Sequence, residues 1–113
     1  MSDMTVAVPL ALEGTVFDRL GKAPLFATCS LRDGEITDWV EHQVGWDQTY
    51  GVDVMGAHHA RVMRFVQDHA VTAVVAADVC DSMRRSLESQ GVSVYDNRSG
   101  DAREAVASLL VTA

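Results

Sequence analysis

The hydrophobic periodicity of the chain changes near its middle, and this change restricts the fold more than any other feature. Residues 5–10, 25–31 and 35–42 are rich in apolar and β-branched side chains, which predicts strands. From 57 to 68 the apolar residues recur at helical spacing instead. Residues 71–77 then form a continuous apolar run, which is typical of a strand buried on both faces.

The C-terminal part continues the alternation of helix and strand. Met83 and Leu87 lie one helical turn apart, and Gly91 stands where a glycine often ends a helix. Residues 92–95 predict a short strand, and Asp101, with a glutamate three residues later, resembles a capping box that opens a last helix. The order β-β-β-α-β-α-β-α predicts an α/β fold with a mixed sheet of about five strands flanked by helices.

Two local signals refine the first three strands. Asp33-Gly34 lies between two strand-like runs, and this dipeptide is a strong β-hairpin signal. Pro9 lacks a backbone N–H, so the first strand is expected either to end there or to lie at an edge of the sheet.

Composition limits the class of protein. The chain has 113 residues, which suits one domain over 1–113, and its 9 basic and 16 acidic residues give a net charge of −7. A nucleic-acid-coating protein needs an excess of Lys and Arg, so nucleic acid is not an expected partner. Two distant cysteines indicate a reducing cytoplasm, and the longest apolar run, 71–77, is too short to span a membrane.

Catalysis has no support in the sequence. The nucleophile elbow GxSxG, the phosphate-binding loop GxxxxGK[ST], the zinc motif HExxH and the pair CxxC are all absent. The first predicted strand, 5–10, carries no carboxylate, whereas two-metal nucleases need paired acids at such positions. The protein is therefore not expected to be an enzyme.

The most specific candidate ligands lie at a predicted loop-to-helix junction. Gly56 is followed, after one alanine, by His58 and His59. Neutral imidazoles are common metal ligands, helix N-termini favour anions, and a glycine allows close approach of the backbone to a ligand. Adjacent helical residues point about 100° apart, so the two histidines would chelate one ion together only if the helix began after them. Packing against the apolar arc of the helix is the alternative interpretation.

The segment after the predicted buried strand holds a second group of candidates. Asp78, Cys80 and Asp81 follow that strand, at the edge of a parallel sheet where ligands gather. A cysteine near a helix start can act as a soft metal ligand, whereas the two aspartates are equally well explained as N-caps. Cys29 lies inside a strand and is predicted to be a small core residue.

The two remaining histidines are expected to have structural roles. His69 lies at the far end of the predicted helix 57–68, where a positive charge favours the helix dipole. His42 ends the third predicted strand, and no function is predicted for it.

Motifs spread over nearly the whole chain carry a family resemblance. They are the strand Thr5–Pro9, the Gly21-Lys22-Ala23-Pro24 segment with Phe26, the 33–36 hairpin, the His58-His59-Ala60-Arg61 helix and the segment 100–106. With these motifs, the chain resembles the dinitrogenase iron–molybdenum cofactor biosynthesis family, which includes NifX- and NafY-like domains and the C-terminal domain of NifB.

The resemblance implies a ribonuclease H-like fold without nuclease activity, and a role in binding or carrying an iron–sulfur or iron–molybdenum cofactor. On this interpretation His58 and His59 are metal ligands, Cys80 is a third, and Gly56 and Asp78 border the pocket. The chain departs from the family pattern at Asp78, which stands where one branch of the family has a histidine. A carboxylate is a harder ligand than an imidazole.

Two hypotheses from different classes remain. The first is a non-enzymatic carrier of a metal cluster, with the loop from Trp46 to Met55 over its pocket, and with a donor or acceptor protein as partner. The second is an interaction or regulatory domain that keeps the fold without the ligand, in which Trp46, Tyr50 and Met55 contact a partner, including a second copy of the chain. Asp78 and the acidic charge favour the second, since an anionic cluster is repelled by acidic surfaces.

Overall fold

The computed structural model describes residues 4–18, 20, 23–32, 35–46 and 57–110, with the backbone alone described for 57–59 and 110. The elements found there follow the predicted order. They are β1 (Met4–Leu10), β2 (Leu25–Arg32), β3 (Glu35–His42), α2 (Ala57–Asp68), β4 (Ala73–Val75), α3 (Asp81–Ser89), β5 (Ser93–Tyr95), α4 (Ala102–Ala107) and the 3₁₀ helix η2 (Ser108–Leu110).

The strands form one mixed sheet in the order β3-β2-β1-β4-β5. The first three strands pair antiparallel, whereas β4 pairs parallel with both β1 and β5. The prediction of a five-stranded mixed α/β sheet is confirmed, and its strand order is compatible with the ribonuclease H-like expectation. Within the residues that the structure covers, no helix is long and apolar enough to cross a membrane.

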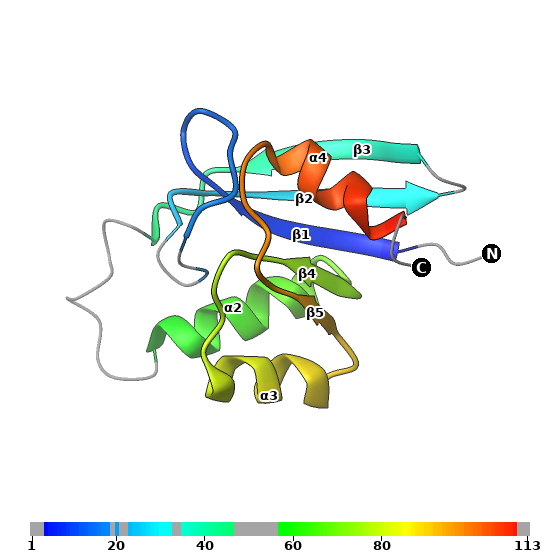
Figure 1. Ribbon diagram of the computed structural model, residues 1–113. Coiled ribbons are helices and arrows are strands. Elements are labelled where there is room, and N and C mark those ends of the chain that lie inside the picture. Colours follow the sequence, from blue (N-terminus) through cyan, green and yellow to red (C-terminus); the bar gives the residue numbers. More distant parts are fainter. Residues whose placement is uncertain (1–3, 19, 21–22, 33–34, 47–56, 111–113) are drawn as a thin grey trace.

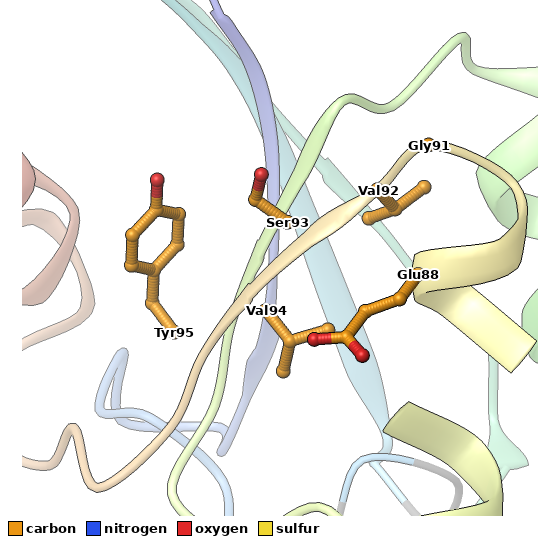
Figure 2. A pocket seen from close by; sticks show the side chains of 6 residues that line it. All are labelled: Glu88, Gly91, Val92, Ser93, Val94 and Tyr95. Carbon is orange, nitrogen blue, oxygen red and sulfur yellow. The ribbon is translucent and has the colours of Figure 1, made fainter. Parts of the chain in front are cut away.

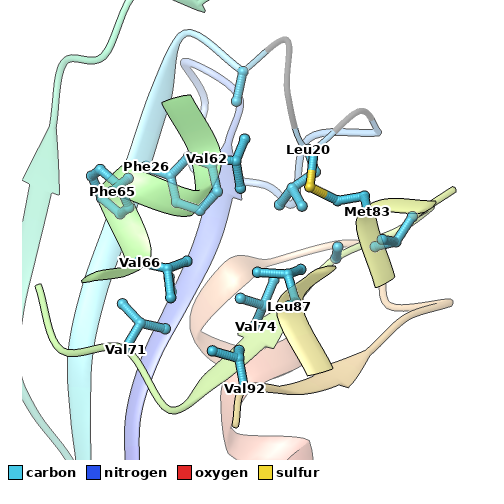
Figure 3. Packing of buried hydrophobic residues seen from close by; sticks show 14 of the residues in the cluster. Leu20, Phe26, Val62, Phe65, Val66, Val71, Val74, Met83, Leu87 and Val92 are labelled. Carbon is cyan, nitrogen blue, oxygen red and sulfur yellow. The ribbon is translucent and has the colours of Figure 1, made fainter. Parts of the chain in front are cut away.

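Helices cover both faces of this sheet, which gives three layers (Figure 1). On one face α2 and α3 pack with Phe26 and Val74 in a single buried cluster (Figure 3). On the other face α4 packs with Val6, Cys29 and other side chains that point away from the first cluster. Successive residues of β1 and β2 serve opposite clusters, as the period of two along a strand requires.

Pro9 lies in the central strand of the sheet, so the expectation of a sheet edge is wrong and that of a strand end is right. Strand β1 pairs with β4 only up to Ala7, two residues before the proline. The Pro9 carbonyl instead accepts a hydrogen bond of 2.9 Å from the Phe17 N–H. The missing N–H therefore falls beyond the parallel ladder and interrupts no bond of the sheet.

The β2–β3 hairpin is confirmed by the pairing of Arg32 with Glu35; its Asp33-Gly34 tip lies outside the described residues. The register shifts between Thr28 and Ser30, opposite Asp38, whose φ is +55°. Such a bulge adds one residue to a strand and turns the following side chains to the other face. As a result, the side chain at the end of β3, His42, lies on the face that α2 covers.

Three aromatic rings hold α2 against the sheet. The ring of Phe26 lies 5.3 Å from that of Trp46 and 5.0 Å from that of Phe65, measured between centroids. Trp46 is only 5% exposed, so it is a core residue with little surface for a partner, and it also lines a hollow beside α2. Residues 47–55 of the predicted covering loop lie outside the described part of the chain. Tyr50 and Met55, predicted for the same roles, lie outside the described residues.

Candidate functional site

Two helices begin at the carboxyl end of β4. Helix α2 precedes β4 in the chain, and α3 follows it. Both helices run antiparallel to β4, so their N-termini lie at the same end of the molecule (Figure 1). Ligands of α/β proteins commonly bind at this end, beyond the carboxyl ends of the strands. The fold therefore places the backbone of His58 and His59, in the first turn of α2, at the same end as Asp78 and Cys80.

Helix α2 begins at Ala57, before the two histidines rather than after them. The condition for joint chelation of one ion by His58 and His59 is not met, because neighbouring side chains leave a helix about 100° apart. Gly56 and the side chains of both histidines lie outside the described part of the chain, so their roles as ligands stay predictions.

Backbone hydrogen bonds hold the segment between β4 and α3. The carbonyl of Ala76 accepts from the Arg98 N–H at 3.1 Å, and that of Ala77 accepts from the Asn97 N–H at 3.0 Å. The Ala76 N–H donates to the carbonyl of Tyr95 at 3.0 Å. Because the turn after β5 is tied to the turn after β4, the chain that leads to Cys80 is fixed on the sheet.

The first turn of α3 is anchored in the same way. The Arg84 N–H donates to the Cys80 carbonyl at 2.9 Å, and the Arg84 guanidinium forms an ion pair with Asp96. Both charged side chains are about one-third exposed, at 29% and 36%. The ion pair joins α3 to the residue that follows β5, and it neutralises one carboxylate near the candidate site.

Cys80 is the N-cap residue of α3, with φ −70° and ψ 158°, and its thiol is exposed. Its Sγ lies 3.5 Å from the hydroxyl of Ser82. This hydroxyl, together with the backbone N–H groups at the start of α3, holds the pKa of the thiol below its usual value of 9.0. Thiolates at helix N-termini are nucleophilic and bind soft metals. Of the two thiols, Cys80 is thus the accessible one and the one whose pKa is lowered.

Neither aspartate beside it acts as the cap. Asp81 is the first residue of α3, where its negative charge favours the helix dipole, and Asp78 is an exposed residue two positions before the cap. The prediction of Asp78 and Asp81 as N-caps is therefore wrong. The capping prediction for Asp101 is confirmed, because its carboxylate accepts the Glu104 N–H at 3.0 Å.

Cys29 has the opposite environment, and its predicted core role is confirmed. It is 2% exposed on β2, among the side chains that pack under α4. Burial raises the pKa of this thiol to about 11, against a smaller lowering by the charge of Arg103. Cys29 is thus a protonated thiol at neutral pH and is shielded from solvent.

Surface hollows lie at the β5 edge and beside α2. A shallow one of about 500 Å³ follows the β5 edge and the last turn of α3, at the opposite end of that helix from Cys80 (Figure 2). Its lining comprises Glu88, Gly91, Val92, Ser93, Val94 and Tyr95. A smaller hollow of about 230 Å³ lies beside α2, next to Trp46 and Phe65. Within the described part of the chain, no three His, Cys, Asp or Glu side chains are grouped as metal ligands.

One cluster escaped prediction. The rings of His42 and His69, from the end of β3 and the residue after α2, lie 4.5 Å apart and share Phe65 as a neighbour. The predicted dipole role of His69 omits this contact. The separation of 27 positions carries no motif, and the contact depends on the bulge at Asp38. The sequence offers one indication: each histidine stands at the end of a predicted element, and the two elements pack on the same face of the sheet.

The fold and the site together define a small mixed-sheet α/β domain with one exposed thiol beyond the carboxyl end of β4. Residues 3–111 match the family described as dinitrogenase iron-molybdenum cofactor. The chain belongs to this family, whose name refers to the iron–molybdenum cofactor, and the sequence-based family assignment is thereby confirmed.

Solved structures share the fold. The crystal structure of PH0822 aligns with a TM-score of 0.77 at 17% identity, over 96% of this chain and 92% of the other. The apo form of the orange protein from Desulfovibrio gigas aligns with a TM-score of 0.74 at 18% identity, over 96% and 88%. An NMR structure of a Thermotoga protein aligns with a TM-score of 0.66 at 23% identity, over 96% and 88%. No curated protein matches the chain.

Proposed function

We propose that this protein is a non-enzymatic carrier of an iron–sulfur or iron–molybdenum type cluster, which is its cargo. One observation carries the proposal: in a member of the iron-molybdenum cofactor family, the one exposed thiol has a lowered pKa and belongs to the N-cap residue of a helix beyond the carboxyl end of β4. Thiolate is the ligand that iron–sulfur clusters use most, and a lowered pKa favours it at neutral pH.

The helix geometry supports contact with a cluster rather than with one ion. Cys80 opens α3, while His58 and His59 lie in the first turn of α2, and both helices begin at the carboxyl end of β4. Helix N-termini carry partial positive charge. The net charge of −7 disfavours an anionic cluster, but this charge is spread over the whole surface. The positive field of the helix N-termini acts at one end of the sheet and offsets the repulsion there.

The remaining candidates have supporting roles in this proposal. Gly56, just before α2, lets the backbone approach the cluster, and the exposed Asp78 borders it as a hard ligand or as a contact for the delivering protein. The partner is the protein that donates or accepts the cluster, and a reducing cytoplasm keeps Cys80 as a thiol. Residues 1–113 act as one unit.

Anaerobic reconstitution with iron and sulfide tests the proposal. The wild type is expected to retain stoichiometric iron with a visible absorption band. Cys80→Ser and the double variant His58→Ala/His59→Ala are expected to lose most of it. Cys29→Ala is the matched control, because it removes the buried thiol and is expected to bind as the wild type does.

Two results would overturn the proposal that this protein carries a cluster. One is a wild type that retains no iron; the other is equal retention by all four proteins. If native mass spectrometry then shows a dimer without added metal mass, the ligand-free interaction domain becomes the better explanation.

A further inference from the structure

The far end of α2, opposite the candidate cluster site, holds a histidine pair. His42 ends β3 and His69 directly follows α2, and their ring centroids lie 4.5 Å apart with a tilt of 51°. The ring of Phe65 lies 4.4 Å from that of His69 and 5.5 Å from that of His42. Both histidines are half-buried, so the two imidazoles are held together by packing and keep access to water.

A hydrogen bond orients one of the rings. His42 Nε2 lies 2.9 Å from the hydroxyl of Thr28 on the neighbouring strand. When Nε2 donates its proton to this oxygen, the lone pair of the neutral ring is on Nδ1. A histidine that binds a metal through one ring nitrogen commonly donates a hydrogen bond from the other ring nitrogen. That hydrogen bond fixes which tautomer is present.

The ring spacing suits a shared ion. Zinc binds imidazole nitrogen at about 2.0–2.1 Å, so two imidazoles on one ion have ring centres roughly 4.5 Å apart at a ligand angle of 90° and roughly 5.2 Å apart at the tetrahedral angle. The observed 4.5 Å lies at the lower end of this range. The χ2 torsion of histidine is a soft rotor, so small ring rotations can aim both lone pairs at one point.

The charged side chains next to the two histidines contact other residues and leave both imidazoles accessible. Asp68 precedes His69 but faces Arg64, with 3.9 Å between Oδ2 and Nε, and Glu41 on β3 is exposed and accepts from the indole N–H of Trp39 at 3.1 Å. No third His, Cys, Asp or Glu joins the pair among the side chains that the structure describes. Water would therefore fill the remaining coordination positions.

We propose that His42 and His69 form a binding site for a borderline divalent cation, with Zn²⁺ as the representative ion. The site would join the end of β3 to the end of α2. It lies 11 residues along the helix from His58, on the order of 16 Å at 1.5 Å per residue. It does not rest on the proposed carrier function, because it uses neither Cys80 nor the first turn of α2.

The test isolates this pair. The chain has four histidines, so a background protein with His58→Gln, His59→Gln and Cys80→Ser keeps only the two imidazoles of the proposed site. Zn²⁺ is titrated by calorimetry, and the imidazole ¹⁵N signals are followed by NMR. We expect one Zn²⁺ per chain, with shifts at both His42 and His69.

Variants of the background protein decide the outcome. His42→Gln and His69→Gln are each expected to weaken Zn²⁺ affinity at least tenfold, and Thr28→Val to weaken it about tenfold through loss of the orienting hydrogen bond. The proposal is overturned if the background protein takes up no Zn²⁺, or if affinity is unchanged in both histidine variants. Far-UV circular dichroism checks that every variant is folded, and the NMR shifts test the site even if one variant is not.

Discussion

Replacing Phe26 with alanine removes the central ring of the aromatic contact that holds α2 on the sheet. Phe26 is 1% exposed and lies between the rings of Trp46 and Phe65, at 5.3 and 5.0 Å. Buried Phe→Ala substitutions cost about 3–5 kcal/mol, because the lost transfer free energy adds to that of the cavity. A domain of this size has a free energy of unfolding of about 5–15 kcal/mol, so Phe26→Ala removes a large part of it.

Urea unfolding measures the effect. With an m-value of about 1–3 kcal/mol/M, the expected loss lowers the midpoint by roughly 1–5 M. Leu12→Ala is the control, since Leu12 is 82% exposed and its loss should change stability by about 0.5 kcal/mol or less. A loss below about 1 kcal/mol for Phe26→Ala, or one equal to that of Leu12→Ala, would refute the three-ring packing.

Three further predictions concern the thiols and one helix cap. Iodoacetamide should modify Cys80 with a pH midpoint below 9.0, and Ser82→Ala should raise that midpoint, which mass spectrometry at each pH measures. Stability should fall between pH 9.0 and about 11, by about 3 kcal/mol at most, because the unfolded chain loses the Cys29 proton first; Cys29→Ala should flatten this fall in alkaline urea titrations. Asp101→Ala should cost about 1 kcal/mol in urea unfolding, and Asp101→Asn much less.

Local signals were enough to predict the order of the elements and most of the core. The continuous apolar run at 71–77 predicted a strand buried on both faces, and β4 lies between β1 and β5 with helices on either side of the sheet. Gly91 lies just past α3 with φ +82°, as a helix-ending glycine should. These features depend on neighbours in the sequence, which is why a pattern of period two or 3.6 reveals them.

Features that depend on contacts between residues far apart in the sequence were not predicted. Trp46 sits in a connecting segment, yet rings from β2 and α2 bury it. Cys80 occupies the N-cap position of α3, between Asp78 and Asp81, and its side chain makes no capping hydrogen bond. Backbone bonds from Asn97 and Arg98 hold the preceding residues Ala76 and Ala77 on the sheet. Capping propensity alone favours aspartate, so the sequence indicated the right segment and the wrong residue.

The iron content of anaerobically reconstituted Cys80→Ser, measured beside Cys29→Ala, tests the central claim most directly. Both variants lack one thiol, but one thiol is exposed at the start of α3 and the other is buried under α4. The carrier proposal predicts that Cys29→Ala retains stoichiometric iron and that Cys80→Ser loses most of it. Equal iron in the two variants, or none in the wild type, would contradict the proposal.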